Sequence, residues 1–127
     1  MVNVAGYIRV STVSQVKEGY SLGEQLDEIE KFCAANGYNL IEIFRDEGKS
    51  GAKTNDDMEI ERDGLLDLLN RIKKGDIQYI VALSTNRLWR SEMVKMIIHR
   101  ELLKYKVDIK SIDLPTYSIF SNDDMTP

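Results

Sequence analysis

Several features that would define a class of protein are scarce in this chain of 127 residues. No hydrophobic run approaches the roughly 20 residues that a membrane-spanning helix needs. A single cysteine, Cys33, excludes an internal disulfide bond. The start, MVNVAGYIRV, lacks the basic region and cleavage signature of a signal peptide. We therefore expect one cytoplasmic domain that folds without disulfide bonds and without a membrane.

An excess of positive charge is also lacking. The chain has 17 lysines and arginines against 21 aspartates and glutamates, which gives a formal net charge of −4. A domain that binds nucleic acid on its own is usually basic as a whole. Any site for phosphate groups must therefore be local.

Histidine occurs once, at position 99. His99 lies in the middle of a predicted helix, on its polar face and away from the strand ends, so we expect it at the surface and not in a serine-histidine-acid triad. No cluster of residues has the spacing of metal ligands. We expect neither a metal nor another cofactor.

The first fifteen residues join a hydrophobic strand to a polar loop. Residues 2–8 form a nearly continuous run of β-favouring residues, which is typical of a strand covered on both faces. The run ends in the loop RVSTVSQ, which contains Arg9, Ser11 and Gln15. A guanidinium and a hydroxyl are thus expected at the carboxyl end of the strand, where open α/β sheets bind ligands.

Helical and strand patterns alternate along the rest of the chain. Ser21 and Glu24 have the spacing of a capping box and open a helix that ends at Asn36-Gly37. The further expected elements are a strand over 39–46, a polar loop over 47–61, a helix over 65–72 closed by 73–75, a strand over 77–83, a helix over 94–105 and a strand over 107–112.

This alternation predicts an α/β fold with a mainly parallel sheet and helices on both faces, a flavodoxin-like three-layer architecture. Parallel strands place their carboxyl ends at one edge. The loops that follow the first three strands should therefore converge there, and together they build one site.

Arginine is the common feature of these loops. Arg9, Arg87 and Arg90 lie in them, and Arg62 precedes the second helix. A guanidinium is permanently charged and its forked donors suit phosphate oxygens. Preorganised arginines around Ser11 would stabilise the charge that develops when a hydroxyl attacks a phosphodiester. The simpler alternative is that single arginines pair with neighbouring carboxylates on a solvated rim.

Four motifs occur in order along the chain: YIRVSTVSQ, DEGKSG, ERDGLLDLL and NRLWRS. In order and spacing they resemble the N-terminal catalytic domain of the serine recombinases, the resolvase and invertase group that includes the large serine integrases. The resemblance covers nearly the whole chain. The stretch SLGEQ, after a somewhat longer loop, is more similar to the large integrase branch than to the short resolvases.

The resemblance implies site-specific DNA recombination without a metal or ATP. Ser11 would attack DNA to give a 5′-phosphoserine link and a free 3′ hydroxyl, followed by strand exchange and resealing. The residues implied to bind the scissile phosphate are Arg9, Arg62, Arg87 and Arg90, and those implied to support the site are Gln15, Gln25, Asp46 and Ser50.

The chain departs from the family pattern at one position and in its extent. Asn86 stands where the family usually has aspartate, and an amide cannot hold a proton as a carboxylate can. In the family the domain continues into a long helix for dimer and tetramer assembly and into DNA-binding domains. Residues 1–127 are therefore expected to be a catalytic-domain fragment, inactive alone, whose full-length form would assemble as a homo-dimer or tetramer on DNA.

Other classes of function are left open by the residues. A flavodoxin-like domain could hold the phosphate of a small ligand in RVSTVS, although the number of arginines argues against it. A receiver-type signalling domain needs carboxylates after the first strand, where this chain has Arg9. A recombinase relative that has lost activity has Asn86 as its one support.

Overall fold

A four-stranded parallel sheet forms the centre of the molecule. The computed structural model describes residues 1–11, 21–48 and 63–120. The strands are β1 (Val2–Ser11), β2 (Tyr38–Gly48), β3 (Tyr79–Ala82) and β4 (Asp108–Ser111). They lie in the order β2-β1-β3-β4, and each neighbouring pair is parallel. The predicted α/β fold is confirmed.

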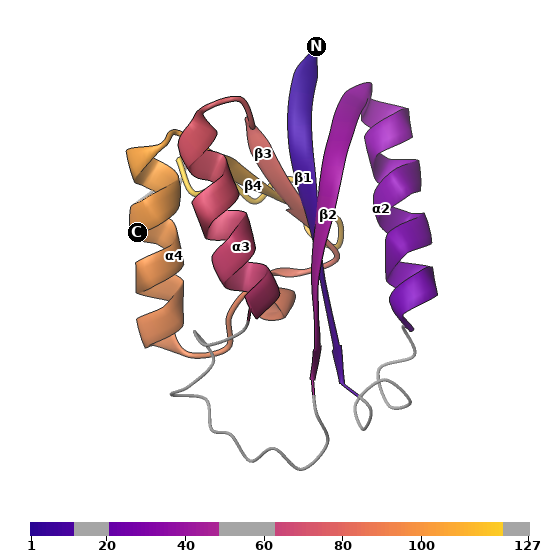
Figure 1. The fold of residues 1–127 in the computed structure, drawn as a ribbon. Helices are drawn as coiled ribbons and strands as arrows, with labels where there is room; N and C mark the ends of the chain where they lie inside the picture. The colour runs from indigo at the N-terminus through magenta and orange to yellow at the C-terminus, as the bar shows by residue number, and fades with distance from the viewer. Residues whose placement is uncertain (12–20, 49–62, 121–127) are drawn as a thin grey trace.

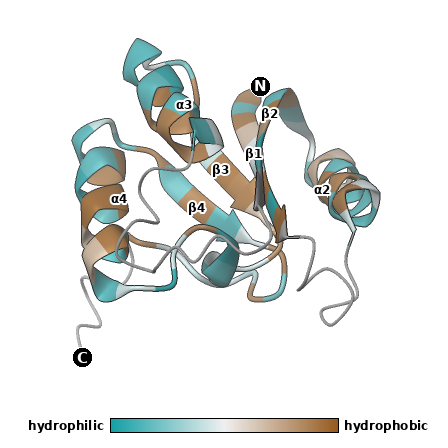
Figure 2. Ribbon diagram, turned by 60° about the horizontal axis from the view of Figure 1, so that its bottom comes forward, coloured by the Kyte–Doolittle hydropathy of each residue, from teal (hydrophilic) through white to brown (hydrophobic). Residues whose placement is uncertain are grey.

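Helices cover both faces of the sheet (Figure 1). One face carries α2 (Leu22–Asn36) and the other carries α3 (Asp63–Arg71) and α4 (Glu92–Lys104). Strand β1 alternates between two hydrophobic clusters, because Val4 and Ile8 pack with Ile29 of α2 while Tyr7 packs with Leu68 of α3. Strands β1 and β3 are mostly hydrophobic, whereas each helix has both hydrophobic and hydrophilic residues (Figure 2).

The helix ends follow the capping signals in the sequence. The Ser21 hydroxyl accepts a hydrogen bond from the Glu24 amide, and the Glu24 carboxylate accepts one from the Ser21 amide. Gly37 ends α2 with a φ of 70°, a conformation that favours glycine. Helix α3 continues into the short 3₁₀ helix η2 (Ile72–Lys74), which ends at Gly75 with a φ of 83°. The predicted start and end of α2 and the predicted end of the second helix at Gly75 are confirmed, whereas α3 begins two residues before the expected position 65.

Strand lengths differ slightly from the expected ones. Strand β2 runs two residues beyond the predicted end at Asp46, because its pairing with β1 continues to the Ser11–Gly48 pair. Strands β3 and β4 are shorter than predicted. These differences leave the order of the elements unchanged.

The sheet has a topological switch point between β1 and β3. From β1 the chain passes through α2 to β2 on one side, and from β2 it passes through α3 to β3 on the other side of β1. In open α/β sheets the crevice at the carboxyl ends of two such strands is the usual place for a ligand. The two strands concerned end in Ser11 and, just before the Thr85–Arg87 turn, in Ala82.

The segment after β4 is fixed against the α4 side of the sheet. Buried Asp108 accepts hydrogen bonds from the Ile119 amide at 2.9 Å and from the Ser118 hydroxyl at 2.6 Å. Ile119 belongs to the core on that side, and Tyr117 packs against it. Across the three described ranges, no helix is long and apolar enough to span a bilayer.

Candidate active site at the carboxyl edge of the sheet

The peptide oxygen of Arg9 is the meeting point of three elements. It accepts hydrogen bonds from Nε2 of Gln25 on α2 and from Nη1 of Arg87 after β3, each at 3.2 Å. Gln25 is fully buried and Arg87 is 8% exposed. The end of β1 is thus held by α2 and by the turn after β3, two residues before Ser11.

The Arg9 side chain ties the same strand to the turn after β3. Its Nη2 donates to the peptide oxygen of Asn86 at 3.1 Å. The turn is the 3₁₀ helix η3 (Thr85–Arg87), in which the Ser84 hydroxyl donates to Oδ1 of Asn86 at 2.6 Å. Across the switch point, the Arg87 side chain therefore binds the main chain of Arg9, and the Arg9 side chain binds the main chain of Asn86.

The side chain of Gln25 at this junction has a buried oxygen that is unsatisfied among the described residues. Oε1 of Gln25 has no hydrogen-bond partner among the described residues, although the Nε2 of the same amide binds the Arg9 oxygen. Buried acceptors are usually paired, and each exception calls for an explanation. This oxygen is an acceptor available to a donor that reaches the end of β1.

Asp46 on β2 links the sheet to the start of α3. Its Oδ1 accepts from the Gly64 amide at 2.8 Å, and its Oδ2 accepts from the Leu65 amide at 2.9 Å and from the Tyr7 hydroxyl at 2.6 Å. A carboxylate that binds the first free amides of a helix acts as its cap, and its negative charge interacts favourably with the positive end of the helix dipole. Asp46 thereby fixes where α3 begins.

Gly64 permits this close approach of helix and strand. A Cβ atom built on Gly64 would lie 2.2 Å from the peptide oxygen of Arg45 and 2.9 Å from Oδ2 of Asp46. No side chain fits there without moving the backbone. The cap and the glycine together fix the start of α3, which follows Arg62 directly in the sequence.

Residues 4–126 match the family described as the resolvase N-terminal domain. The chain belongs to this family. Its fold resembles the crystal structure of the N-terminal catalytic domain of TP901-1 integrase, with 30% identity, a TM-score of 0.71 and coverage of 89% of this chain and 78% of that one. The match with an integrase agrees with the resemblance that SLGEQ indicated.

Two further relatives extend the comparison. A resolvase family site-specific recombinase from Streptococcus pneumoniae shares the fold with a TM-score of 0.73 and 20% identity over 99% of this chain and 88% of that one. The uncharacterized immunity region protein 3 of Bacillus phage phi105 is 37% identical over 73 residues, which are 58% of this chain and 82% of that protein.

The resolvase-type domain brings most of the predicted site residues to one edge. Arg9, Gln25, Asn86 and Arg87 are joined by hydrogen bonds, and Asp46 pairs with Arg9 in the sheet register. Arg90 is exposed three residues beyond Arg87. Strand β1 ends at Ser11, whose backbone pairs with Gly48. Gln15, Ser50 and Arg62 lie outside the described residues.

Three contributors were not singled out by the sequence patterns: Tyr7, Gly64 and Ser84. Tyr7 reads as one more hydrophobic strand residue, and its hydroxyl is the one signal that distinguishes it. Gly64 stands at the start of a helix, where glycine is unfavourable unless packing requires it. Ser84 follows the third strand and was grouped with the loop.

His99 of α4 contacts Trp89, which follows Arg87 by two residues. The expectation of a surface position for His99 holds only in part, because its imidazole is half-buried against the indole of Trp89, with ring centroids 5.1 Å apart. Within residues 1–11, 21–48 and 63–120, no group of three or more histidines, cysteines or carboxylates is placed to hold a metal ion.

Proposed function

We propose that this chain is the catalytic domain of a site-specific DNA recombinase and that Ser11 is its nucleophile. The observation that carries the proposal is that the peptide oxygen of Arg9 accepts hydrogen bonds from both Gln25 and Arg87. These bonds fix the end of β1 at the switch point, two residues before Ser11. Membership of the resolvase N-terminal domain family supports recombination as the general class of activity.

The proposed reaction exchanges one phosphodiester bond for another. The Ser11 oxygen forms a bond to phosphorus and loses its proton, while the bond from phosphorus to the 3′ oxygen breaks and that oxygen takes up a proton. The products are a 5′-phosphoserine link and a free 3′ hydroxyl. In the reverse direction a 3′ hydroxyl of the exchanged strand attacks the phosphoserine and restores the DNA. The bond count is unchanged, so no energy source is needed.

The arginines supply the charge that this step requires. Arg9, Arg62, Arg87 and Arg90 are proposed to bind the oxygens of the scissile phosphate, on which negative charge increases in the transition state. The bonds of Arg9 and Arg87 to peptide oxygens orient these guanidinium groups before DNA arrives. Fixed donors of this kind cost no reorganisation during the reaction.

Supporting roles are proposed for five other residues: Gln15, Gln25, Asp46, Ser50 and Asn86. Gln25 holds the Arg9 peptide, and Asp46 sets the start of α3 beyond Arg62. Asn86 presents its peptide oxygen to Arg9. For Gln15 and Ser50 the proposal rests on their matching the family motifs in the sequence.

We further propose that residues 1–127 act as one catalytic domain of a longer protein, in which an oligomerisation helix and DNA-binding domains form a homo-dimer or tetramer on DNA in the cytoplasm. The net charge of −4 agrees with this arrangement, because most of the affinity for DNA would come from other domains.

Ser11→Ala tests the proposal. The domain is joined to the oligomerisation and DNA-binding segments and incubated with DNA that carries its recombination site. Denaturing gels should show a covalent protein–DNA adduct with the parent protein and none with Ser11→Ala. Ser14→Ala, a matched change in the same loop, should keep the adduct. An adduct that persists in Ser11→Ala would refute the assignment of the nucleophile.

A further inference from the structure

The turn that carries Arg87 and Arg90, residues 84–90, is held by contacts with β1 and with α4. Toward β1, Arg87 binds the peptide oxygen of Arg9. Within the turn, the Leu88 and Trp89 amides both donate to the Thr85 oxygen, at 2.9 and 3.0 Å. The contact with α4 is made by the side chain of Trp89, which lies between the two arginines in the sequence.

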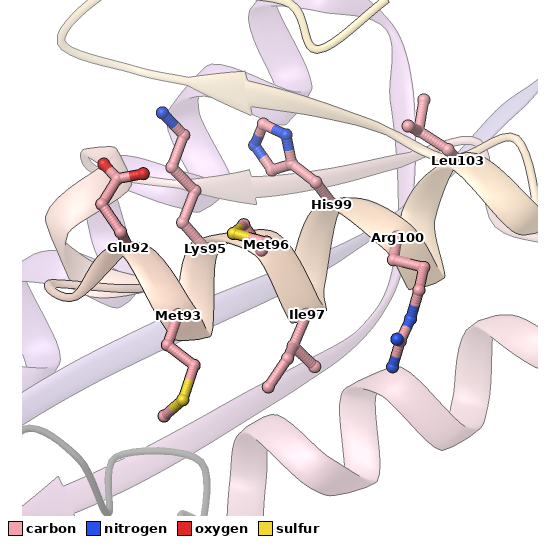
Figure 3. A pocket seen from close by; sticks show the side chains of 8 residues that line it. All are labelled: Glu92, Met93, Lys95, Met96, Ile97, His99, Arg100 and Leu103. Carbon is pink, nitrogen blue, oxygen red and sulfur yellow. The ribbon is translucent and has the colours of Figure 1, made fainter.

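Trp89 packs edge to face against His99 of α4. The ring centroids are 5.1 Å apart and the ring planes are inclined by 75°, a favourable geometry for aromatic pairs. Trp89 also packs on the hydrophobic core under α3 and α4. His99 leaves α4 on the same side as Lys95, whereas Met93 and Ile97 leave it on the opposite side (Figure 3).

Tyr117 approaches the imidazole from the segment after β4. Its hydroxyl lies 3.5 Å from Nε2 of His99. The segment itself is fixed, because Asp108 binds Ser118 and the Ile119 amide directly after Tyr117. His99 therefore lies between an element that is anchored to β4 and the indole of the arginine-bearing turn.

We propose that His99 is a positioning residue for the turn 84–90, that it acts through Trp89, and that Tyr117 fixes the imidazole from the other side. The proposal rests on the proposed function in so far as Arg87 and Arg90 are the groups being positioned. It concerns how those arginines are held, and not which residue attacks DNA.

The surroundings of His99 favour its neutral form. Burial lowers the pKa of the imidazole from its ordinary value of 6.5, and the positive charge of Lys95 lowers it further, while Glu92 and Asp108 act in the opposite direction. Tyr117 is uncharged here, since burial raises the pKa of its hydroxyl above the ordinary value. A proton on His99 would place a charge in a half-buried contact beside Lys95.

The sign of the pH dependence follows from this lowered pKa. The unfolded chain takes up a proton on His99 near pH 6.5, and the folded chain does so at a lower pH. The contribution of neutral His99 to stability is therefore complete above pH 6.5 and declines as the pH falls below that value. The position of the turn in the folded chain should change at the lower pH at which folded His99 takes up its proton.

A pH titration of the 15N-labelled chain by NMR tests the proposal without DNA. The Nε–H signals of Arg87 and Arg90 and the indole signal of Trp89 should move with the midpoint of His99, which lies below pH 6.5. Arg71, which pairs with Asp76 at the far edge of the sheet, is the internal control and should not follow that midpoint. Arginine signals of the turn that ignore the His99 midpoint would overturn the proposal.

Two variants separate positioning from folding. Tyr117→Phe removes one hydroxyl and should move the pH midpoint of His99. The midpoints of the pH-dependent Arg87 and Arg90 signals should move by the same amount. If these signal midpoints separate from that of His99, the coupling is refuted. In His99→Gln the arginine signals should lose the transition altogether, and a transition that stays would again refute it.

The cleavage assay then links the turn to the reaction. With the extended protein, cleavage by the parent should fall as His99 takes up its proton, and His99→Gln should lack this step in its pH profile. Parallel pH profiles would show that His99 does not act on the site. If no cleavage occurs at any pH, the proposed function fails, whereas the NMR result still decides the positioning role.

Discussion

The two edges of the sheet use polar side chains in different ways. At the amino edge, the guanidinium of Arg71 binds both carboxylate oxygens of Asp76, at 2.7 and 3.2 Å, while Nδ2 of Asn3 donates to the peptide oxygen of Asp76. At the carboxyl edge, the side chains of Arg9, Arg87 and Asp46 bind the main chain of neighbouring elements.

Under the proposed function, this difference separates a structural edge from the catalytic one. The Arg71–Asp76 pair joins opposite charges, and the bond from Arg71 lowers the pKa of the Asp76 carboxyl below its ordinary value. A peptide oxygen has no net charge, so the bonds of Arg9 and Arg87 to such oxygens orient the guanidinium groups but are not ion pairs. Under the proposed function, the same residue type serves stability at one edge and phosphate binding at the other.

The largest expected effect comes from exchanging arginine for lysine at the two edges. Arg87→Lys replaces a planar fork by a single ammonium, which cannot bind the Arg9 oxygen and a phosphate in the same way. Removing one preorganised donor typically costs about 10²- to 10³-fold in rate. We expect a loss of this size in single-turnover cleavage by the extended protein.

The matched control is Arg71→Lys at the amino edge, where the ion pair is exposed to solvent. This change should leave the cleavage rate unchanged. Equal losses of activity in Arg87→Lys and Arg71→Lys would show that arginine at the carboxyl edge has no catalytic role that arginine at the amino edge lacks.

A smaller effect is expected in stability from Asp46→Asn. One oxygen of Asp46 would be replaced by an NH₂ group, which cannot accept the hydrogen bonds from α3 and Tyr7. An unsatisfied buried partner costs about 1–3 kcal/mol, and we expect the free energy of unfolding in urea to fall by that amount. Asp76→Asn, the same change in the exposed pair at the amino edge, should have a much weaker effect. The reverse order would show that the cap does not hold α3.

The sequence predicted the elements of this fold well because its signals were local. The capping box at Ser21, the glycines at the helix ends and the strand pattern before Ser11 each depend on a few neighbouring residues. The parallel sheet then required that the loops after the strands converge. For this reason the grouping of Arg9 with Arg87 could be predicted before any coordinates were known.

The contacts that the sequence did not predict are tertiary ones. Tyr7 and Asp46 meet because neighbouring strands bring them together, and neither residue signals this by its local pattern. His99 lies on the flank of a helix, where periodicity does not distinguish a solvated side chain from one that is covered by Trp89 and Tyr117. The contacts of Tyr7 and of His99 are made with segments more than nine residues away in the chain.

The smallest effect is expected from Asn86→Asp, which tests the position where the chain departs from its family. Aspartate keeps an oxygen that can accept from the Ser84 hydroxyl, and the bond from Arg9 goes to the main chain, so folding should be intact. The added carboxylate can exchange a proton or orient an arginine, so single-turnover cleavage should be equal or faster. A strong fall in rate would show that the carboxyl edge is built around the amide.

The most direct test of the central claim is to locate the covalent bond to DNA. The adduct formed by the extended protein is digested with trypsin and nuclease, and the modified peptide is sequenced by mass spectrometry. Residues 10–17, VSTVSQVK, should carry the phosphate remnant, and fragment ions should place it on Ser11. A phosphate on Thr12, on Ser14 or on any peptide outside this loop would contradict the account of the carboxyl edge as the catalytic site.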